Sequence, residues 1–172
     1  MSSAPSAEAA HYGDTVGAVL AHGIRLLTDA GIETAAQEAV WILESVLSLP
    51  LLELRLHPER SLSPVDRDRI LALLERRSAR EPLQYLLGTQ EFFGRSFHVT
   101  PAVLIPRPET ELLIHEVLRR APVGRACLIA DIGTGSGCLA VTLALQLPQC
   151  GILAVDRSSN ALVVAKQNAV RH

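Results

Sequence analysis

Three glycines at alternate positions, in the segment DIGTGSG (131–137), are the residues of this sequence best suited to binding a small molecule. Glycine adopts main-chain conformations that other residues avoid and, without a Cβ atom, lets a ligand approach the backbone closely. The dinucleotide fingerprint is G-x-G-x-x-G, with the pyrophosphate at the N-terminus of a helix. These glycines follow G-x-G-x-G instead, so the spacing disfavours a nicotinamide dehydrogenase.

A second acidic residue, Asp156, ends the apolar run GILAVD downstream of the glycines. At the tip of a strand its carboxylate can accept two charge-assisted hydrogen bonds from ribose hydroxyls. With Asp131 in front of the glycines, this spacing is typical of enzymes that use S-adenosylmethionine, a cofactor without phosphate. A simpler interpretation stays open, in which the glycines make a tight turn and Asp156 only caps the next helix.

The segment IPRPETE (105–111) lies between an expected strand and an expected helix. Pro106 and Pro108 fix their own φ and restrict the residues before them to extended geometry. The segment can therefore form a rigid wall beside a bound molecule. It can equally be a stiff helix entrance in which Glu109 and Glu111 favour the first turn, and the residues alone leave both interpretations open.

A βαβ unit is expected to position the glycine loop. The apolar run ACLIADIG, the loop, a helix from about Cys138 and the run GILAVD follow one another in that order. This is the order of two parallel strands joined by a crossover helix, and continuously apolar strands suit a parallel sheet. The predicted fold class is α/β, with the incomplete start of a Rossmann-like domain in the C-terminal part.

The N-terminal part has helical periodicity instead. We expect a disordered tail over 1–12, a helix capped by Asp14, a second helix through Ala36 and Leu47, and a further helix with Ser63 as its cap. These amphipathic segments predict a helical bundle over 13–80. The runs LQYLLG, QEFFG and SFHV, broken by glycines, predict a small hairpin that links the two parts over 81–104.

Charge and composition narrow the possible partners. The net charge is only −2, so global electrostatics favour neither nucleic acid nor an acidic membrane surface. Cys127, Cys138 and Cys150 fit no common zinc or disulfide spacing, and we expect them to be reduced. With no signal peptide and no long apolar run, the prediction is a cytoplasmic protein without membrane contact, direct nucleic-acid binding or a metal site.

Taken together, IPRPETE, DIGTGSG and AVD are similar to the release-factor glutamine methyltransferase family, of the HemK or PrmC type. The resemblance also includes RSAREPLQYLLGTQEFFG and VTPAVLIPRPETE, and it extends over roughly residues 15–172. It implies an N-terminal helical domain that docks the protein substrate, a linking hairpin and a methyltransferase domain. It further implies that S-adenosylmethionine donates a methyl group to the glutamine amide of a Gly-Gly-Gln motif in class 1 peptide chain release factors.

Carried over residue by residue, the resemblance gives two sets of site residues. The cofactor would be bound by Gly133, Thr134, Gly135, Ser136, Gly137 and Asp156. The mouth of the active site would be lined by a wall segment consisting of Arg107, Pro108, Glu109 and Thr110. The implied domains are a substrate-docking domain over 13–80, a hairpin linker over 81–104 and a partial methyltransferase domain over 105–172.

The family's Asn-Pro-Pro-Tyr loop, which orients the substrate amide, does not occur in this sequence. Asn160 and Asn168 are its only asparagines, and neither is followed by proline. We therefore assign no catalytic residue and expect a fragment that is inactive alone. Two other functions stay open, namely a non-catalytic binding module that keeps the docking helices and a glutamine methyltransferase for a ribosomal protein.

Overall fold

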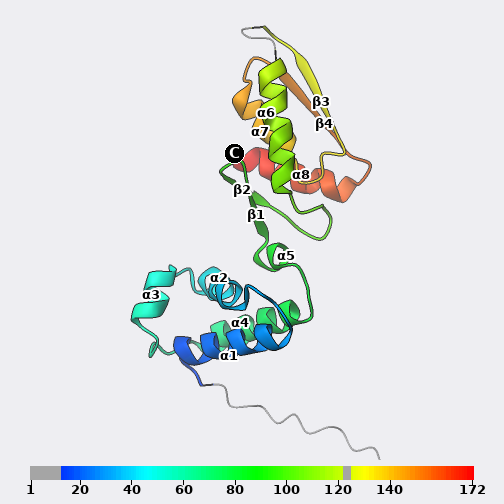
Figure 1. Cartoon of the computed structure of the whole chain (residues 1–172). Helices are drawn as coiled ribbons and strands as arrows, with labels where there is room; N and C mark the ends of the chain where they lie inside the picture. Colours follow the sequence, from blue (N-terminus) through cyan, green and yellow to red (C-terminus); the bar gives the residue numbers. More distant parts are fainter. Residues whose placement is uncertain (1–12, 122–124) are drawn as a thin grey trace, which may run out of the picture. The chain divides into compact units, whose positions relative to one another are not determined.

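The computed structural model describes residues 13–121 and 125–172, and the chain divides between Leu86 and Leu87 into two compact units (Figure 1). The expected tail over 1–12 lies outside the described residues. Each unit has its own core. The first unit is helical, and the second contains all four strands of the described chain.

The helices of the first unit are α1 (Val16–Asp29), α2 (Ala35–Leu47), α3 (Leu51–Leu56) and α4 (Pro64–Ser78). Helices α1, α2 and α4 pack against one another, because each has an apolar stripe that only a neighbouring helix can cover. The fully buried residues of this core include Val16, Val19, Leu27, Ile42, Leu43, Ile70 and Leu74. The predicted helical N-terminal region is thus confirmed.

The N-terminal cap residue is the predicted one at α4 and a different one at α1. Ser63 accepts a hydrogen bond from the Asp66 N–H, at 3.1 Å, as expected of a cap. At α1 the cap is Thr15, whose hydroxyl accepts from the Ala18 N–H at 3.3 Å. The prediction of Asp14 as the cap is wrong by one residue, because the Asp14 carboxylate forms an ion pair with Arg67 instead.

The segment between the two cores begins with a helix, so the strand-like interpretation of LQYLLG is wrong. Helix α5 spans Leu83–Leu87, and its first turn forms because the Pro82 carbonyl accepts hydrogen bonds from the N–H groups of Tyr85 and Leu86. The hairpin itself is confined to β1 (Thr89–Phe92) and β2 (Arg95–His98), which pair antiparallel with Thr89 opposite His98.

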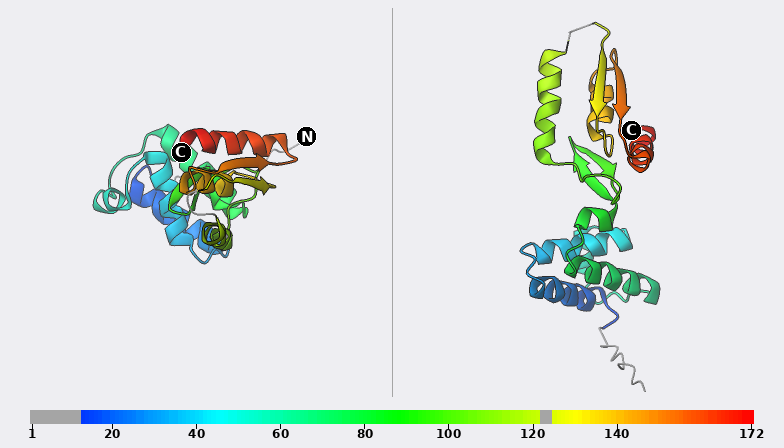
Figure 2. Two further views of the ribbon diagram at one scale, coloured as in Figure 1. Left: turned by 90° about the horizontal axis from the view of Figure 1, so that it is seen from above. Right: turned by 90° about the vertical axis from the view of Figure 1, so that its right-hand side faces the viewer.

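The second unit is built on two parallel strands, β3 (Leu128–Ile132) and β4 (Gly151–Val155). Helix α7 (Cys138–Gln146) connects them, the short 3-10 helix η1 (Pro108–Thr110) leads into α6 (Glu111–Arg120), and α8 (Ser159–Arg171) follows β4 (Figure 2). The predicted order of strand, glycine loop, helix and strand is confirmed, as is the partial Rossmann-like α/β class.

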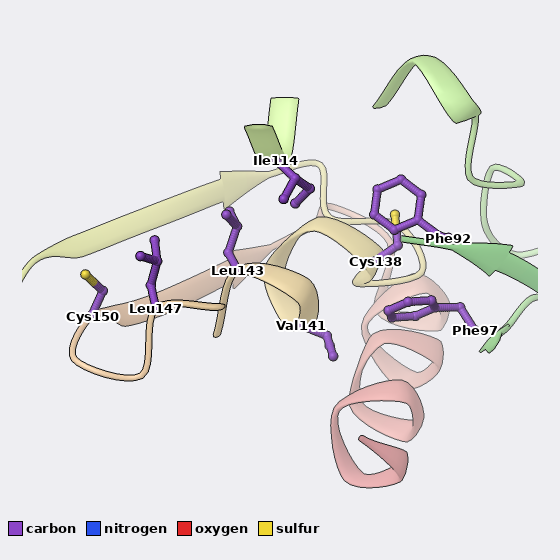
Figure 3. Packing of buried hydrophobic residues seen from close by; sticks show 8 residues of the cluster. All are labelled: Phe92, Phe97, Ile114, Cys138, Val141, Leu143, Leu147 and Cys150. Carbon is purple, nitrogen blue, oxygen red and sulfur yellow. The ribbon is translucent and has the colours of Figure 1, made fainter. Parts of the chain in front are cut away.

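The core of this unit brings together residues from the hairpin, α6, α7 and the turn before β4 (Figure 3). Its buried members are Phe92, Phe97, Ile114, Cys138, Val141, Leu143, Leu147 and Cys150. From the sheet, Ile129 and Ile152 pack against it. Side chains alternate across a strand, so the opposite face of the sheet has Leu128, Ile132, Leu153 and Val155, which are all exposed.

The expectation of three reduced cysteines is wrong for two of them. Cys127 and Cys150 form a disulfide, with Cα atoms 4.5 Å apart, and Cys138 is free and buried. The parallel register pairs Leu128 with Gly151, so the residues before them lie side by side at the start of the two strands. A spacing rule along the sequence cannot show this register. No helix within the described ranges is long and apolar enough to cross a membrane.

Candidate functional site

The glycine loop lies at the carboxyl ends of β3 and β4. The N–H groups of Gly133 and Thr134 both donate to the Val155 carbonyl, at 2.7 and 2.9 Å, so the loop folds over the end of β4. In an open α/β sheet, ligands bind at the carboxyl ends of the strands. The loop therefore lies where this architecture has its binding site.

The three glycines of the loop have different roles. All have positive φ, at +82° for Gly133, +55° for Gly135 and +79° for Gly137. A Cβ atom at Gly133 or Gly135 would meet no atom within 4 Å, whereas at Gly137 it would lie 3.0 Å from the Cβ of Ala165 on α8. Gly133 and Gly135 thus leave the backbone open to a ligand, and Gly137 is required for close packing of the loop on α8.

The residues between the glycines shape the loop from inside. Thr134 is only 5% exposed, and its hydroxyl donates to the Asp131 carboxylate at 2.7 Å. Ser136 is 2% exposed. Little surface of either residue is open to a ligand, so in this conformation the accessible part of the loop is at Gly133 and Gly135.

The Asp156 carboxylate is oriented by two main-chain groups. One oxygen accepts from the Ser158 N–H and the other from the Gly135 N–H, both at 2.9 Å. These bonds hold the pKa of Asp156 below its usual value. The cap bond of α8 is made by Ser158, whose hydroxyl accepts from the Ala161 N–H. Each Asp156 oxygen keeps a lone pair, so the carboxylate can still accept hydrogen bonds from ligand hydroxyls.

The wall segment lies at the entrance to α6. Arg107 has the extended conformation expected before proline, and Pro108–Thr110 form η1. Arg107, Pro108 and Glu109 are exposed. The next residue, Glu111, accepts a hydrogen bond from the Phe93 N–H at 2.8 Å and so connects the start of α6 to the hairpin turn. Sequence reasoning gave Glu111 no such role, because its partner lies 18 residues away.

Asn168 of α8 is a further residue that the sequence did not indicate. Its side chain is fully buried and hydrogen-bonded both to His98 at the end of β2 and to the Ser136 carbonyl in the glycine loop. The helical period placed Asn168 on α8 only. Its partners lie 70 and 32 residues away, and no local pattern encodes them.

A separate cavity of about 300 Å³ lies between α7, β4 and α8. Its lining is mostly alanine and aliphatic side chains, and of the predicted cofactor residues it includes only Gly137. It offers no acid to bind ribose hydroxyls. We therefore place the candidate site at the open side of the loop, beside Asp156.

The second unit thus has a glycine loop with an open backbone beside an acid at the end of the next parallel strand. Residues 108–172 match the family model for the methyltransferase small domain, and residues 18–88 match the model for the PrmC N-terminal domain. Both units are covered, and the chain belongs to the release factor glutamine methyltransferase family.

Relatives with that name are similar over most of this chain. The protein of Geobacter sulfurreducens is 47% identical over 146 residues, which are 85% of this chain and 51% of the relative. The proteins of Koribacter versatilis and Moorella thermoacetica are 50% and 42% identical, over 67% and 90% of this chain and over 41% and 55% of their own lengths. The chain spans about half the length of the curated relatives it matches.

Proposed function

We propose that this protein takes part in methylating the glutamine amide of the Gly-Gly-Gln motif in class 1 peptide chain release factors, with S-adenosylmethionine as the methyl donor. The observation that carries the proposal is the open backbone at Gly133 and Gly135 beside the oriented carboxylate of Asp156. A ligand with a ribose and no phosphate fits this combination, because the acid would accept the hydroxyls and would repel a phosphate.

Bound there, the cofactor supplies an electrophilic methyl group on its sulfonium. The chain's own residues would bind and orient it, with Asp156 accepting the ribose hydroxyls and the main chain at Gly133 and Gly135 in contact with the rest. Thr134, Ser136 and Gly137 belong to the same loop and would maintain its shape. The wall segment, Arg107 to Thr110, would stand at the mouth of the site, with Pro108 and the preceding Pro106 limiting its freedom.

The amide nitrogen of the substrate is a poor nucleophile, because its lone pair is delocalised into the carbonyl group. Acceptors must therefore hold the NH2 group in line with the methyl group. Asn168 cannot do this, since its side chain is fully buried and bonded, and Asn160 is exposed on the first turn of α8. We therefore assign no catalytic residue and expect residues 1–172 alone to give no turnover.

The helical domain over 13–80 would dock the release factor, and the linker over 81–104 would join it to the partial methyltransferase domain over 105–172. Exposed apolar side chains on α2 and α3, namely Trp41, Leu52 and Leu56, offer a contact surface for a protein partner. We place the protein in the cytoplasm with its substrate, without a membrane or nucleic-acid partner. In that compartment the disulfide between Cys127 and Cys150 would be exposed to reducing thiols.

Titration of the 172-residue chain with S-adenosylhomocysteine, followed by NMR, tests the cofactor assignment. We expect weak binding, with the largest shifts at the amides of Gly133, Gly135 and Asp156, and no binding of NAD. Shifts confined to other residues, or preferential binding of NAD, would overturn the assignment.

Two alternative functions predict different results. A binding module without a catalytic role would bind a release factor through the first unit and show no cofactor shifts. A glutamine methyltransferase for a ribosomal protein would show the cofactor shifts and bind that protein in preference to a release factor. Binding of each candidate substrate to the full chain, measured by calorimetry, separates the three functions.

A further inference from the structure

We propose that Asn168 is a positioning residue that couples strand β2 of the hairpin to the glycine loop, so that the shape of the loop depends on the seating of the hairpin. Its effect on cofactor binding rests on the proposed function, whereas the coupling itself does not.

The first observation is the bonding of the Asn168 side chain. Its Oδ1 accepts from the His98 N–H at 2.7 Å, and its Nδ2 donates to the His98 carbonyl at 2.9 Å and to the Ser136 carbonyl at 2.8 Å. A neutral amide has two N–H donors, and here each has its own acceptor. Because the residue is fully buried, no water can replace a lost partner without rearrangement.

The second observation is that the loop is held on α8 at two adjacent points. Gly137 packs against Ala165, where even a Cβ atom would be 3.0 Å from the Ala165 Cβ. Ser136, the residue before it, bonds to Asn168. Positions 165 and 168 are three apart on a helix and therefore lie on one face. This face of α8 fixes the second half of the loop, while the Val155 carbonyl and Asp156 fix the first half.

The third observation is that Asn168 binds both main-chain groups of His98, the last residue of β2. It therefore acts as a short extension of the sheet at that edge. In Figures 1 and 2 the hairpin and α8 lie side by side, in agreement with these bonds and with the contact between the rings of Phe97 and His172, whose centroids are 4.9 Å apart. A displacement of β2 by one residue would break both His98 bonds.

A leucine at position 168 would fill apolar space without needing any partner. An asparagine there is destabilising unless all three bonds form, because unsatisfied buried polar groups are costly. The packing is thus tied to one relative placement of β2 and the loop. Strand β2 leads along the chain into the wall segment, so a single side chain links the cofactor loop to the strand that precedes the proposed mouth of the site.

The test is amide hydrogen exchange on the 172-residue chain without ligand, comparing wild type with Asn168→Asp. This change keeps the size and the acceptor for the His98 N–H but removes both donors. We expect the amides of Gly135 and Gly137 to exchange about tenfold faster, as for the loss of one hydrogen bond, with the β3 and β4 ladder amides unchanged. The matched control is Asn160→Asp, an exposed asparagine on the same helix.

Two results would overturn the coupling. Uniform acceleration across the second unit, as expected for a core variant such as Ile114→Val, would show that Asn168 only stabilises the fold. Loop exchange equal to that of the control would show no role. If Asn168→Asp does not fold, Asn168→Ser carries the same prediction, because it introduces no charge and its shorter side chain still loses the contact with Ser136.

Titration with S-adenosylhomocysteine then tests the consequence for the cofactor. We expect the Kd of Asn168→Asp to rise about tenfold, as for one lost hydrogen bond, and the Kd of Asn160→Asp to stay at the wild-type value. If the loop amides of Asn168→Asp exchange faster but its Kd stays at the wild-type value, the predicted effect on cofactor binding is wrong. Failure of wild type to bind the ligand at all would count against the proposed function, whereas the exchange result decides the coupling by itself.

Discussion

At the scale of single residues, the position of Asp156 is defined by its own unit before any ligand binds. Two main-chain N–H groups fix the carboxylate, and they favour its charged form. A carboxylate that is already oriented would lose little conformational freedom if a ligand bound to it. The sequence placed Asp156 at the tip of a strand, but the bond to Gly135 depends on how the loop folds over β4.

Replacing Asp156 by alanine should weaken binding of S-adenosylhomocysteine about tenfold or more, because hydrogen bonds to a charged acceptor are lost. Asp156→Asn should have a smaller effect, since it keeps one acceptor. NMR titration of the full chain measures both. Ser158→Ala is the control, because it removes the cap of α8 and leaves Asp156 in place. An equal loss in Ser158→Ala and Asp156→Ala would show that Asp156 acts only through the helix.

In the first unit, a buried ion pair joins α2 to α4. The side chains of Glu38 and Arg77 are only 10% and 15% exposed, and Thr34 also donates to Glu38, at 2.8 Å. Burial alone would raise the pKa of Glu38, but the hydrogen bonds from Arg77 and Thr34 outweigh it and hold the pKa below its usual value. The pair therefore links stability to pH.

Glu38→Gln should lower the free energy of unfolding of the first unit by about 3 kcal/mol at pH 7, because the positive charge of Arg77 is left partly buried without a compensating carboxylate. The folded-state pKa is below the unfolded value, so the contribution is complete above the unfolded pKa and is lost as pH falls through the folded pKa. The difference between wild type and variant should therefore shrink at acidic pH.

Denaturation followed by Trp41 fluorescence measures this stability in the first unit alone, since Trp41 is the only tryptophan of the sequence and lies on α2. Asp68→Asn, which changes an exposed pair with Arg67, is the matched control and should have almost no effect. A Glu38→Gln effect that stays the same from pH 7 down to a pH at which carboxylates are fully protonated would contradict the role of the ion pair.

At the scale of elements, the disulfide closes the βαβ unit at the end opposite to the glycine loop. Cys127 and Cys150 are 23 positions apart in the sequence, and the segment between them includes α7 and the whole loop. A cross-link over a segment of this length stabilises a fold mainly by restricting the unfolded chain. Both cysteines contact the apolar core beneath the sheet, so their thiols would remain packed after reduction.

Reduction with dithiothreitol should lower the stability of the second unit by about 3 kcal/mol, the value expected for closing a loop of this length. Calorimetry should show the transition of this unit moving to lower temperature, while the Trp41 signal of the first unit stays unchanged. Cys127→Ala should already melt at the lower temperature and should not respond to the reductant. A reductant-sensitive transition in Cys127→Ala would place the sensitivity elsewhere.

The sequence predicted those elements whose signals are local. The βαβ order follows from apolar runs around a glycine loop, and the cap at Ser63 from one residue type before a proline. Two predictions were wrong because a residue distant in the sequence determines the structure: Asp14 pairs with Arg67, and Cys127 pairs with Cys150 through the register of the strands. The role of Asn168 was not predicted for the same reason, since its partners lie in β2 and the loop. The run LQYLLG was assigned wrongly because a short apolar run is compatible with both a strand and a helix.

At the scale of the whole molecule, one face of the β3 and β4 pair has four exposed large apolar side chains. They are Leu128, Ile132, Leu153 and Val155, with exposures between 38% and 76%. Both strands also have an outer edge without a described partner strand. Exposed apolar faces and strand edges favour association with other chains.

The 172-residue chain should therefore self-associate in a concentration-dependent way. The variant with Ile132→Lys and Leu153→Lys should remain monomeric, because two charges on that face oppose its burial. Sedimentation velocity measures this, with Leu52→Lys, which changes an exposed residue of the first unit, as the control. Association that disappears only in Leu52→Lys would show that the self-association surface lies on the first unit.

The most direct test of the proposed function is methyl transfer by a chimera. Residues 1–172 would replace the matching part of the Geobacter sulfurreducens relative, which is 47% identical over 146 residues. Labelled methyl transfer from S-adenosylmethionine to an unmethylated release factor should occur with the chimera, should fall about tenfold or more in its Asp156→Ala variant at low cofactor concentration, and should be absent with the 172 residues alone. A folded chimera that transfers no methyl, or one that is indifferent to Asp156→Ala, would contradict the proposal.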